Sequence, residues 1–473
     1  MQTDAETARF KRTEAMGEDK ITKLLIRFSG PAILAAETSA FYNLFDAIWC
    51  GRLSTEAVAA LTVANPLMAI YRAIGAGIGV GTTSLIARHL GAGRREETDK
   101  TAGCSISFFF LLSNLVAIIC LINLKTLLQI FGADSSVLPY AESYMFIETV
   151  FLPLDFFLVL LVELIRVGGN PSFASTGMII ASLMDLVFSP ILVFGIWLFP
   201  ALGIAGAALG TTVGRGVGVS ILLAYIILGK SIYRFKPSYF RLNFRTIYEI
   251  YRVGISQTVR ASAASLSQAI ANNIAASFGV ATLAVLGVLF KVNMVVFSFC
   301  MGVGQGMLPL VGYNFGAKKK ERVGEAVLKA GLISFSWGAL CWIIVMLFPN
   351  EIIALFGTDP KFLVEGVGAI RIFAFSFFAM GLQSNLSFFF QGIGRGIPSL
   401  IIASSRQLIF LIPCLLIAPG LFGLTGLWMS YPIADALAIT LSLAWTISTF
   451  HSLKIPLKLR SSINYQTSSE ADS

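Results

Sequence analysis

Long stretches without any charged side chain constrain the fold of this chain more than any other feature. Four of them exceed about 18 residues, the length with which a helix crosses the roughly 30 Å hydrocarbon core of a bilayer; they cover residues 106–124, 292–317, 331–349 and 372–394. Only 13% of the 473 residues are charged, about half the share found in soluble domains. Because a lipid interior offers no partner to a backbone amide outside its own segment, the sequence predicts an all-α integral membrane protein.

Twelve transmembrane helices are expected from the hydropathy pattern. They cover residues 22–50, 57–88, 101–125, 137–166, 171–197, 203–229, 245–278, 281–314, 323–349, 361–393, 397–418 and 423–452. If the N-terminus is cytoplasmic, most of the 35 Lys and Arg lie on that side, whereas the opposite loops carry only Arg52, Lys125 and Lys361. Because basic residues gather on the cytoplasmic side, we expect both termini there, in the cytoplasmic (inner) membrane. The net charge of +9 is then a membrane feature and indicates no nucleic-acid partner.

An internal repeat divides the chain into two halves. The run GAGRRE at 91–96 recurs as GAKKKE at 316–321, FGAD at 131–134 recurs as FGTD at 356–359, and GIAG at 203–206 recurs as GLTG at 423–426. Six spans per half is an even number, so the repeat is parallel, with a pseudo-twofold axis along the membrane normal. We expect an N-terminal tail at 1–21, an N-lobe of six helices at 22–229, a cytoplasmic linker at 230–252, a C-lobe of six helices at 253–452 and a C-terminal tail at 453–473.

Glycine-rich and basic segments have structural interpretations. Gly206, Gly210, Gly214 and Gly218 recur every four residues, which favours close helix packing, with a hinge as the alternative. The glycines at 75–81 and 302–306 lie in apolar spans without a preceding strand or a Walker lysine, so we interpret them as packing sites and not as phosphate loops. The basic, aromatic linker at 230–252 is expected to form an amphipathic helix on anionic headgroups.

Three segments resemble the MATE family of multidrug and toxin exporters. QGMLPLVGYNFGA at 305–317 is similar to the end of the family's eighth helix, FYNLFDAIW at 41–49 to the end of its first, and GIAGAALGT at 203–211 to the start of its sixth. The resemblance extends from about residue 20 to 454. It implies a twelve-helix, two-lobe antiporter that exports organic, often cationic compounds in exchange for inward H⁺ or Na⁺. The lipid bilayer and a small-molecule substrate are its partners, no cofactor is expected, and we expect a monomer.

Charged residues at membrane depth are costly and therefore indicate function or pairing. The first half holds the acids Glu37, Asp46, Glu148, Asp155, Glu163 and Asp185, with Arg72, Arg166 and Arg215 nearby. The second half holds mostly bases, namely Arg260, Lys291, Arg371 and Arg406, with Asp435 as a late acid. We expect Arg260 to pair with Asp435, with contact to an anionic substrate as the alternative. The spacing of seven and eight residues between Glu148, Asp155 and Glu163 predicts one shared helical face. Cation chemistry is therefore expected in the N-lobe.

Asp46 and Asp185 are the candidate cation-coupling residues. Asp46 matches the family's ion-binding aspartate, and Pro31, which cannot donate a backbone hydrogen bond, matches its kinking proline and is a candidate hinge. Relatives with acidic N-lobes carry Asn-x-x-x-Asp-Pro on helix five, whereas this chain has Asp185 at the asparagine and Ser189 at the aspartate position. This shift leaves H⁺ and Na⁺ both open as the coupled ion. Possible further oxygen ligands for sodium are Asn43, Ser189 and Thr211, the last by resemblance.

The substrate cleft has a second set of candidates. They are the polar residues Tyr42, Glu37, Asp155, Glu163, Asn272, Asn273 and Gln383. The nearest alternative function is a flippase of a lipid-linked saccharide or another amphiphile with the same two-lobe plan, because such a cavity is basic and the C-lobe is rich in arginine. An enzyme is not expected, since His89 and His451 are the only histidines and no metal or nucleophile cluster is apparent. The six cysteines are interpreted as apolar packing residues.

Overall fold

The computed structural model describes residues 11–196, 199–357 and 359–457, and the side chains of these residues except 40–48, 51 and 55. This part of the chain is helical and contains no strand. The helices are α2 (Ile21–Gly51), α3 (Thr55–Gly91), α4 (Arg95–Ile122), α5 (Leu124–Ile130), α6 (Leu138–Val150), α7 (Leu152–Val167), α8 (Pro171–Phe194), α9 (Ile204–Ile227), the short η1 (Pro237–Phe240), α10 (Phe244–Phe278), α11 (Val280–Gly316), α12 (Lys320–Leu347), α13 (Pro349–Ala354), α14 (Pro360–Phe373), α15 (Ser376–Gly392), α16 (Gly396–Ser404), the π-helical η2 (Ser405–Leu411) and α17 (Ile412–Leu453).

Twelve membrane spans are present in the described part of the chain, as predicted. Seven helical stretches are long and apolar enough to cross a membrane, and two bent pairs, α6/α7 at 49° and α14/α15 at 44°, add two more. α2 and α10 do not meet the same test, but they are also long enough, at 31 and 35 residues. The stretch Gly396–Leu453 holds 58 residues and breaks at Gly423, where φ is 57°, so it supplies two spans. The expected spans 137–166 and 361–393 are therefore correct in extent but broken in the middle.

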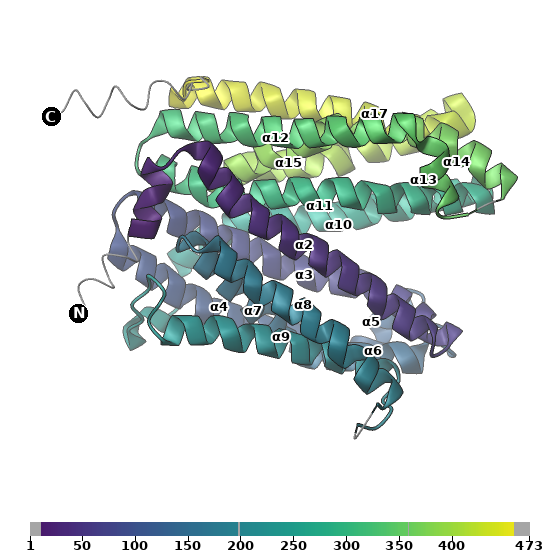
Figure 1. The fold of residues 1–473 in the computed structure, drawn as a ribbon, viewed down its shortest axis with the longest axis horizontal. Helices are drawn as coiled ribbons and strands as arrows, with labels where there is room; N and C mark the ends of the chain where they lie inside the picture. Colours follow the sequence, from purple (N-terminus) through teal and green to yellow (C-terminus); the bar gives the residue numbers. More distant parts are fainter. Residues whose placement is uncertain (1–10, 197–198, 358, 458–473) are drawn as a thin grey trace.

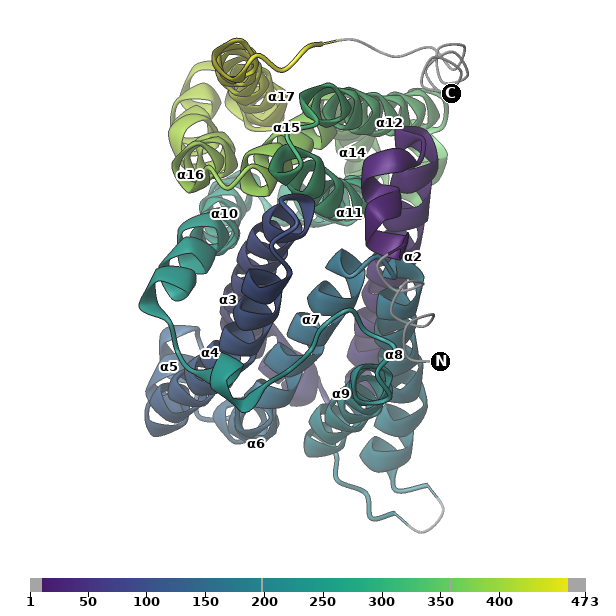
Figure 2. The same ribbon diagram turned by 90° about the vertical axis from the view of Figure 1, so that its left-hand side faces the viewer.

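Two lobes lie side by side with their helices nearly parallel (Figure 1). α3–α9 form the first lobe and α10–α17 the second, and α2 runs diagonally from the second lobe to the first (Figures 1 and 2). The start of α2 and the end of α17 lie at the same end of the bundle, which we call the tail end; α5, α6, α13 and α14 lie at the opposite, far end (Figure 1). The start of α2 is buried with the second lobe, since Leu24 and Phe28 share an apolar core with residues of α11, α12 and α15.

The duplication is visible in the backbone. Left-handed φ angles occur at matching positions of the two halves, in the pairs Gly93 and Lys318, Gly169 and Gly394, Gly203 and Gly423, and Gly229 and Lys454. Lys318 and Lys454 are the non-glycine members, a conformation that is costly for a residue with a Cβ atom. The halves therefore keep the same chain path even where the second half has lost the glycine that suits it.

Glycines mark close helix contacts, one between the two lobes and one between α11 and the start of α2, which confirms their interpretation as packing sites. A Cβ atom on Gly77 of α3 would lie 2.7 Å from the Gly254 carbonyl oxygen of α10, and one on Gly306 of α11 would lie 2.3 Å from Ser29 Oγ of α2. The same two contacts carry hydrogen bonds, from Ser29 Oγ to the Val303 carbonyl at 3.3 Å and from Thr258 Oγ1 to the Ala73 carbonyl at 3.1 Å. Small residues let helix backbones approach within van der Waals contact, so both contacts depend on them.

The linker differs from its prediction. Residues 231–236 form no regular helix, η1 follows, and α10 begins at Phe244, so 230–252 is not one amphipathic helix. The segment packs on the first lobe: Tyr233 donates its hydroxyl to the Leu164 carbonyl at 2.8 Å, and Ser107 donates to the Phe240 carbonyl at 2.7 Å. Burial of its aromatic rings against α4 and α7, with Pro237 starting η1, outweighs helix formation on a lipid surface.

The N-terminal segment ties the two lobes together at the tail end. Residues 11–18 are helical. Arg322 of the second lobe donates to the carbonyls of Met16 at 3.2 Å and Asp19 at 2.6 Å. Arg12 donates to the hydroxyl of Tyr225, in the first lobe, at 3.3 Å. The tail end is therefore closed by a chain segment that contacts both lobes.

Candidate functional site

A cavity of about 350 Å³ lies between the lobes and is lined by α2, α3, α7, α8, α9 and α11. Its polar lining includes Arg72, Asp155, Asp185, Thr211, Arg215 and Ser298. The rest is largely apolar, with Leu158, Met178 and Met294 among the wall residues. A mostly apolar cavity with a few converging polar groups is typical of a small-molecule site.

Asp185 is the carboxylate at the base of this cavity. It lies on α8 with 2% of its surface exposed. Its Oδ1 accepts hydrogen bonds from Ser189 Oγ at 2.7 Å and from Thr211 Oγ1 at 3.1 Å, whereas Oδ2 is buried without a hydrogen-bond partner among the described residues. The structure thus brings together Asp185, Ser189 and Thr211, with two hydroxyls fixing one oxygen and leaving the other open.

The glycine stripe of α9 explains this close grouping. A Cβ atom on Gly210 would lie 2.5 Å from Ser189 Oγ, and one on Gly214 would lie 2.4 Å from the Ala181 carbonyl oxygen. The two helices can lie this close only because these positions lack side chains. The packing interpretation of the stripe is confirmed, and its consequence is that Thr211 reaches across to Asp185.

A second acidic group surrounds Arg215 on α9. Its Nη1 lies 2.7 Å from Glu148 Oε2 of α6, and its Nε lies 3.2 Å from Asp155 Oδ1 of α7. The bend of 49° between α6 and α7 lets the two acids approach one guanidinium from different helices. Glu163, which was predicted on the same face, instead pairs with Arg166 at 2.5 Å and does not line the cavity.

The remaining candidates are dispersed. Glu37 accepts a hydrogen bond from Ser298 of α11, Gln383 is buried and donates to the Ile402 carbonyl at 3.2 Å, and Asn272 and Asn273 are exposed on α10. Pro31 lies inside α2, which continues as a helix through it. The candidate residues Tyr42, Asn43 and Asp46 lie on the same helix, but their side chains are outside the described residues.

The prediction that Asp435 pairs with Arg260 in the second lobe is wrong, because Asp435 has a different partner. Asp435 binds Arg406 through both carboxylate oxygens, with 3.1 Å between Nη2 and Oδ2. Arg260 instead donates to Gln257 Oε1 from Nε at 3.0 Å and from Nη2 at 2.6 Å and stacks on Phe297. η2 is π-helical, which shifts the face that Arg406 presents relative to a regular α-helix.

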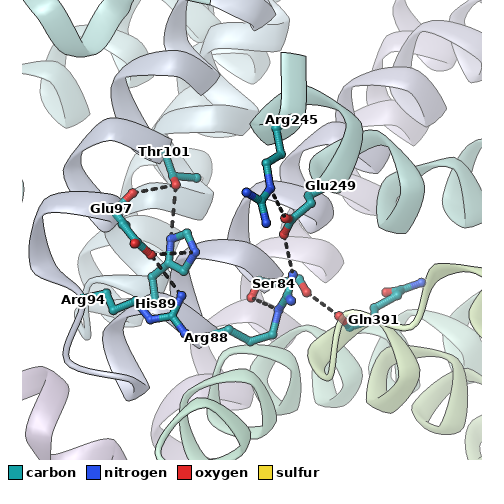
Figure 3. A network of polar contacts seen from close by, with 9 residues as sticks. All are labelled: Ser84, Arg88, His89, Arg94, Glu97, Thr101, Arg245, Glu249 and Gln391. Carbon is teal, nitrogen blue, oxygen red and sulfur yellow. Dashed lines mark hydrogen bonds and ion pairs between the residues drawn. The ribbon is translucent and has the colours of Figure 1, made fainter. Parts of the chain in front are cut away.

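The cavity is closed toward the tail end by contacts between the lobes. Arg88 of α3 lies 3.9 Å from Glu249 of α10, and Ser84 donates to the carbonyl of Gln391 of α15 (Figure 3). A Cβ atom on Gly91 would lie 1.9 Å from the Tyr313 carbonyl oxygen, so α3 and α11 also touch there. Toward the far end the two lobes diverge (Figure 1).

Comparison with known proteins identifies this architecture. The MatE family model matches residues 31–191 and 259–416, one segment in each lobe. The chain belongs to the MatE family. Family membership makes it a multipass membrane transporter and not an enzyme, and explains the internal repeat.

MatE relatives cover nearly the whole chain. The multidrug export protein MepA of Staphylococcus haemolyticus is 25% identical over 430 residues, which are 90% of this chain and 93% of the relative. MepA of Staphylococcus aureus is 25% identical over 421 residues, 88% and 91% of the two chains. Among solved structures, a multidrug resistance MATE transporter in the outward-facing conformation superposes with a TM-score of 0.87 at 24% identity, covering 93% of this chain and 98% of that one. A MOP superfamily transporter from Pyrococcus furiosus, described as having a binding pocket of reversed polarity, gives 0.87 at 23% with the same coverage.

Several polar cavity residues were not predicted from the sequence as site residues. They include Arg72 and Arg215 of the first lobe and Ser298 of the second. Arg72 carried a signal, since it is a charged residue in the middle of an apolar span. Ser298 carried none, because a serine at membrane depth often bonds to its own helix.

Proposed function

We propose that this protein is a secondary antiporter that exports organic, mainly cationic amphiphiles in exchange for an inward cation bound at Asp185. The observation that carries the proposal is the open Oδ2 of a carboxylate that is 2% exposed, beside a cavity between the two lobes. The relatives named for multidrug export support the substrate class. Asp46 and Asn43 of α2, which packs against α8, are proposed to complete the ion site.

The coupled ion is H⁺ or Na⁺. An anionic carboxylate in a low-dielectric site favours either a proton or a partly dehydrated cation. Ion binding neutralises Asp185, removes its attraction for a cationic substrate and lets the lobes re-pack. The substrate then leaves as the ion enters, which is the exchange that an antiporter requires.

We further propose that the tail end is cytoplasmic, in the inner membrane, and that the protein works as a monomer. The turns at that end carry Arg94, Arg95 and Lys318–Lys320, in the sense of the positive-inside rule. The structure, with its lobes in contact at the tail end, then corresponds to the outward-facing state. A cavity built within one chain supports function without a partner subunit.

The experiment is transport of ethidium into inside-out proteoliposomes, driven by a pH gradient alone and then by a sodium gradient alone. We expect one of the two gradients to drive uptake in the wild type and neither to drive it in Asp185→Asn. Glu163→Gln is the matched control, because it removes a buried carboxylate of the same lobe that does not line the cavity. Gradient-driven uptake by folded Asp185→Asn at the wild-type rate would exclude Asp185 as the ion site.

The same vesicles test the flippase alternative. A flippase predicts scrambling of a fluorescent lipid-linked saccharide without ethidium uptake, whereas the antiporter predicts the reverse.

A further inference from the structure

The cavity holds one positive charge that the ion chemistry does not use. Arg215 is matched by Glu148 and Asp155. Arg72 of α3 also lines the cavity and its side chain is exposed, yet within the described residues it has no hydrogen bond and no ion pair. An uncompensated guanidinium that faces an open cavity at membrane depth requires an explanation.

The position of Arg72 is fixed from both sides. The preceding Tyr71 is buried, and its hydroxyl lies 3.0 Å from Thr149 Oγ1 of the first lobe. The carbonyl of the following Ala73 accepts the hydrogen bond from Thr258 of α10. Because its neighbours in sequence are held by α6 and α10, the helix face that carries Arg72 is directed at the cavity by the fold itself.

The unmatched charges of the cavity are therefore of opposite sign. Asp185 Oδ2 is a buried oxygen without a donor, and Arg72 is a guanidinium without an acceptor; no ion pair joins them, although both line the same space. A guanidinium offers two parallel N–H groups that match a carboxylate, and such bidentate bonds are stronger than neutral ones. A compound that carries both a positive and a negative group complements this cavity better than a simple cation.

We propose that Arg72 binds a carboxylate of the transported compound, so that this one residue sets the preference between the acid and the ester forms of the same cationic amphiphile. The inference rests on the proposed export function and adds a specificity-determining residue to it. The carboxylate lies at Arg72, the aromatic body against Leu158, Met178 and Met294, and the cationic group toward Asp155 and Asp185. Arg72 acts by binding and orienting the substrate, and it takes no part in ion coupling.

The test uses two dyes that differ at one group. Rhodamine 110 has a free carboxylate and rhodamine 123 is its methyl ester, so both keep the same cationic ring system. Uptake of each into proteoliposomes is measured for the wild type, Arg72→Gln, Arg72→Lys and Arg260→Gln. The last variant is the matched control, because it removes an arginine of the second lobe that has no carboxylate partner in the described residues and does not line this cavity.

We expect Arg72→Gln to raise the KM for rhodamine 110 by about tenfold or more, which corresponds to the loss of one charge-assisted hydrogen bond. The KM for rhodamine 123 should change less than about twofold. Arg72→Lys should recover part of the loss, and Arg260→Gln should not distinguish the dyes. Equal loss of both dyes in Arg72→Gln would overturn the proposal and indicate a structural role or lipid phosphate binding; no loss of either would overturn it as well. If the wild type transports neither dye nor ethidium, the export function itself fails, and the inference fails with it.

Discussion

Replacing Gly254 by alanine tests how the lobes are held together at the tail end. The new Cβ atom would lie 2.2 Å from the carbonyl oxygen of Gly77, so the two helices must separate by roughly 1 Å to restore ordinary contact. Overpacking of this kind costs about 1–3 kcal/mol. The cost falls only on the conformation in which α3 and α10 touch. The ratio of tail-closed to tail-open molecules should therefore fall by roughly 5- to 150-fold.

The population shift is measured by electron–electron distance spectroscopy between spin labels at Glu96 and Lys320, exposed positions at the tail end on opposite lobes. The control is Gly287→Ala, because a Cβ atom at Gly287 of α11 meets nothing within 4 Å while the gain in helix propensity is the same. We expect a longer label distance to become populated in Gly254→Ala and not in Gly287→Ala. Indistinguishable distance distributions in the two variants would show that the glycine contact does not determine which state is populated.

Two further predictions concern pairs that hold the lobes in shape. Arg322→Ala removes the donor to the main-chain carbonyls of residues 16–19 and should lower stability by about 1–3 kcal/mol, seen as earlier loss of monodisperse protein on heating in detergent; an unchanged profile would mean that the N-terminal segment is held elsewhere. Asp435→Asn leaves the Arg406 guanidinium buried without its counter-charge and should cost about 3–5 kcal/mol, whereas Asp435→Leu combined with Arg406→Met should recover most of it. A double variant no better than the single one would show that the pair contributes more than mutual neutralisation.

The sequence was sufficient to predict the helix number and the two-lobe arrangement, because several independent sequence features indicate the same architecture. Span length, the even number of spans per half and the repeat each predict a twelve-helix, two-lobe protein, and no single contact decides it. The grouping of Asp185, Ser189 and Thr211 was also accessible, since the first two are one helical turn apart and the family resemblance supplied the third.

Contacts that depend on helix phase were not accessible from the sequence. Asp435 pairs with Arg406 and not with Arg260, because a π-helical turn changes the direction in which the Arg406 side chain points. No residue type in the sequence predicts such a turn. The break before α7 did have a signal, since Pro153 lies at its first turn and disfavours a helical conformation in the residue before it. The break between α14 and α15 at Ala374–Phe375 has no proline, and packing alone places it.

The duplication allows the two lobes to carry different side chains at the same backbone position. A Cβ atom on Gly79 would lie 3.2 Å from Glu163 Cγ, and one on Gly304, at the matching position of the second half, would lie 2.1 Å from Phe388. The same helix contact thus joins a glycine to a carboxylate in one lobe and to an aromatic ring in the other. The backbone needs only a glycine at this crossing, so the facing residue was free to differ. Under the proposed antiport mechanism, a carboxylate that binds the ion is needed in only one of the two lobes, so the matching position of the other lobe can hold an aromatic ring.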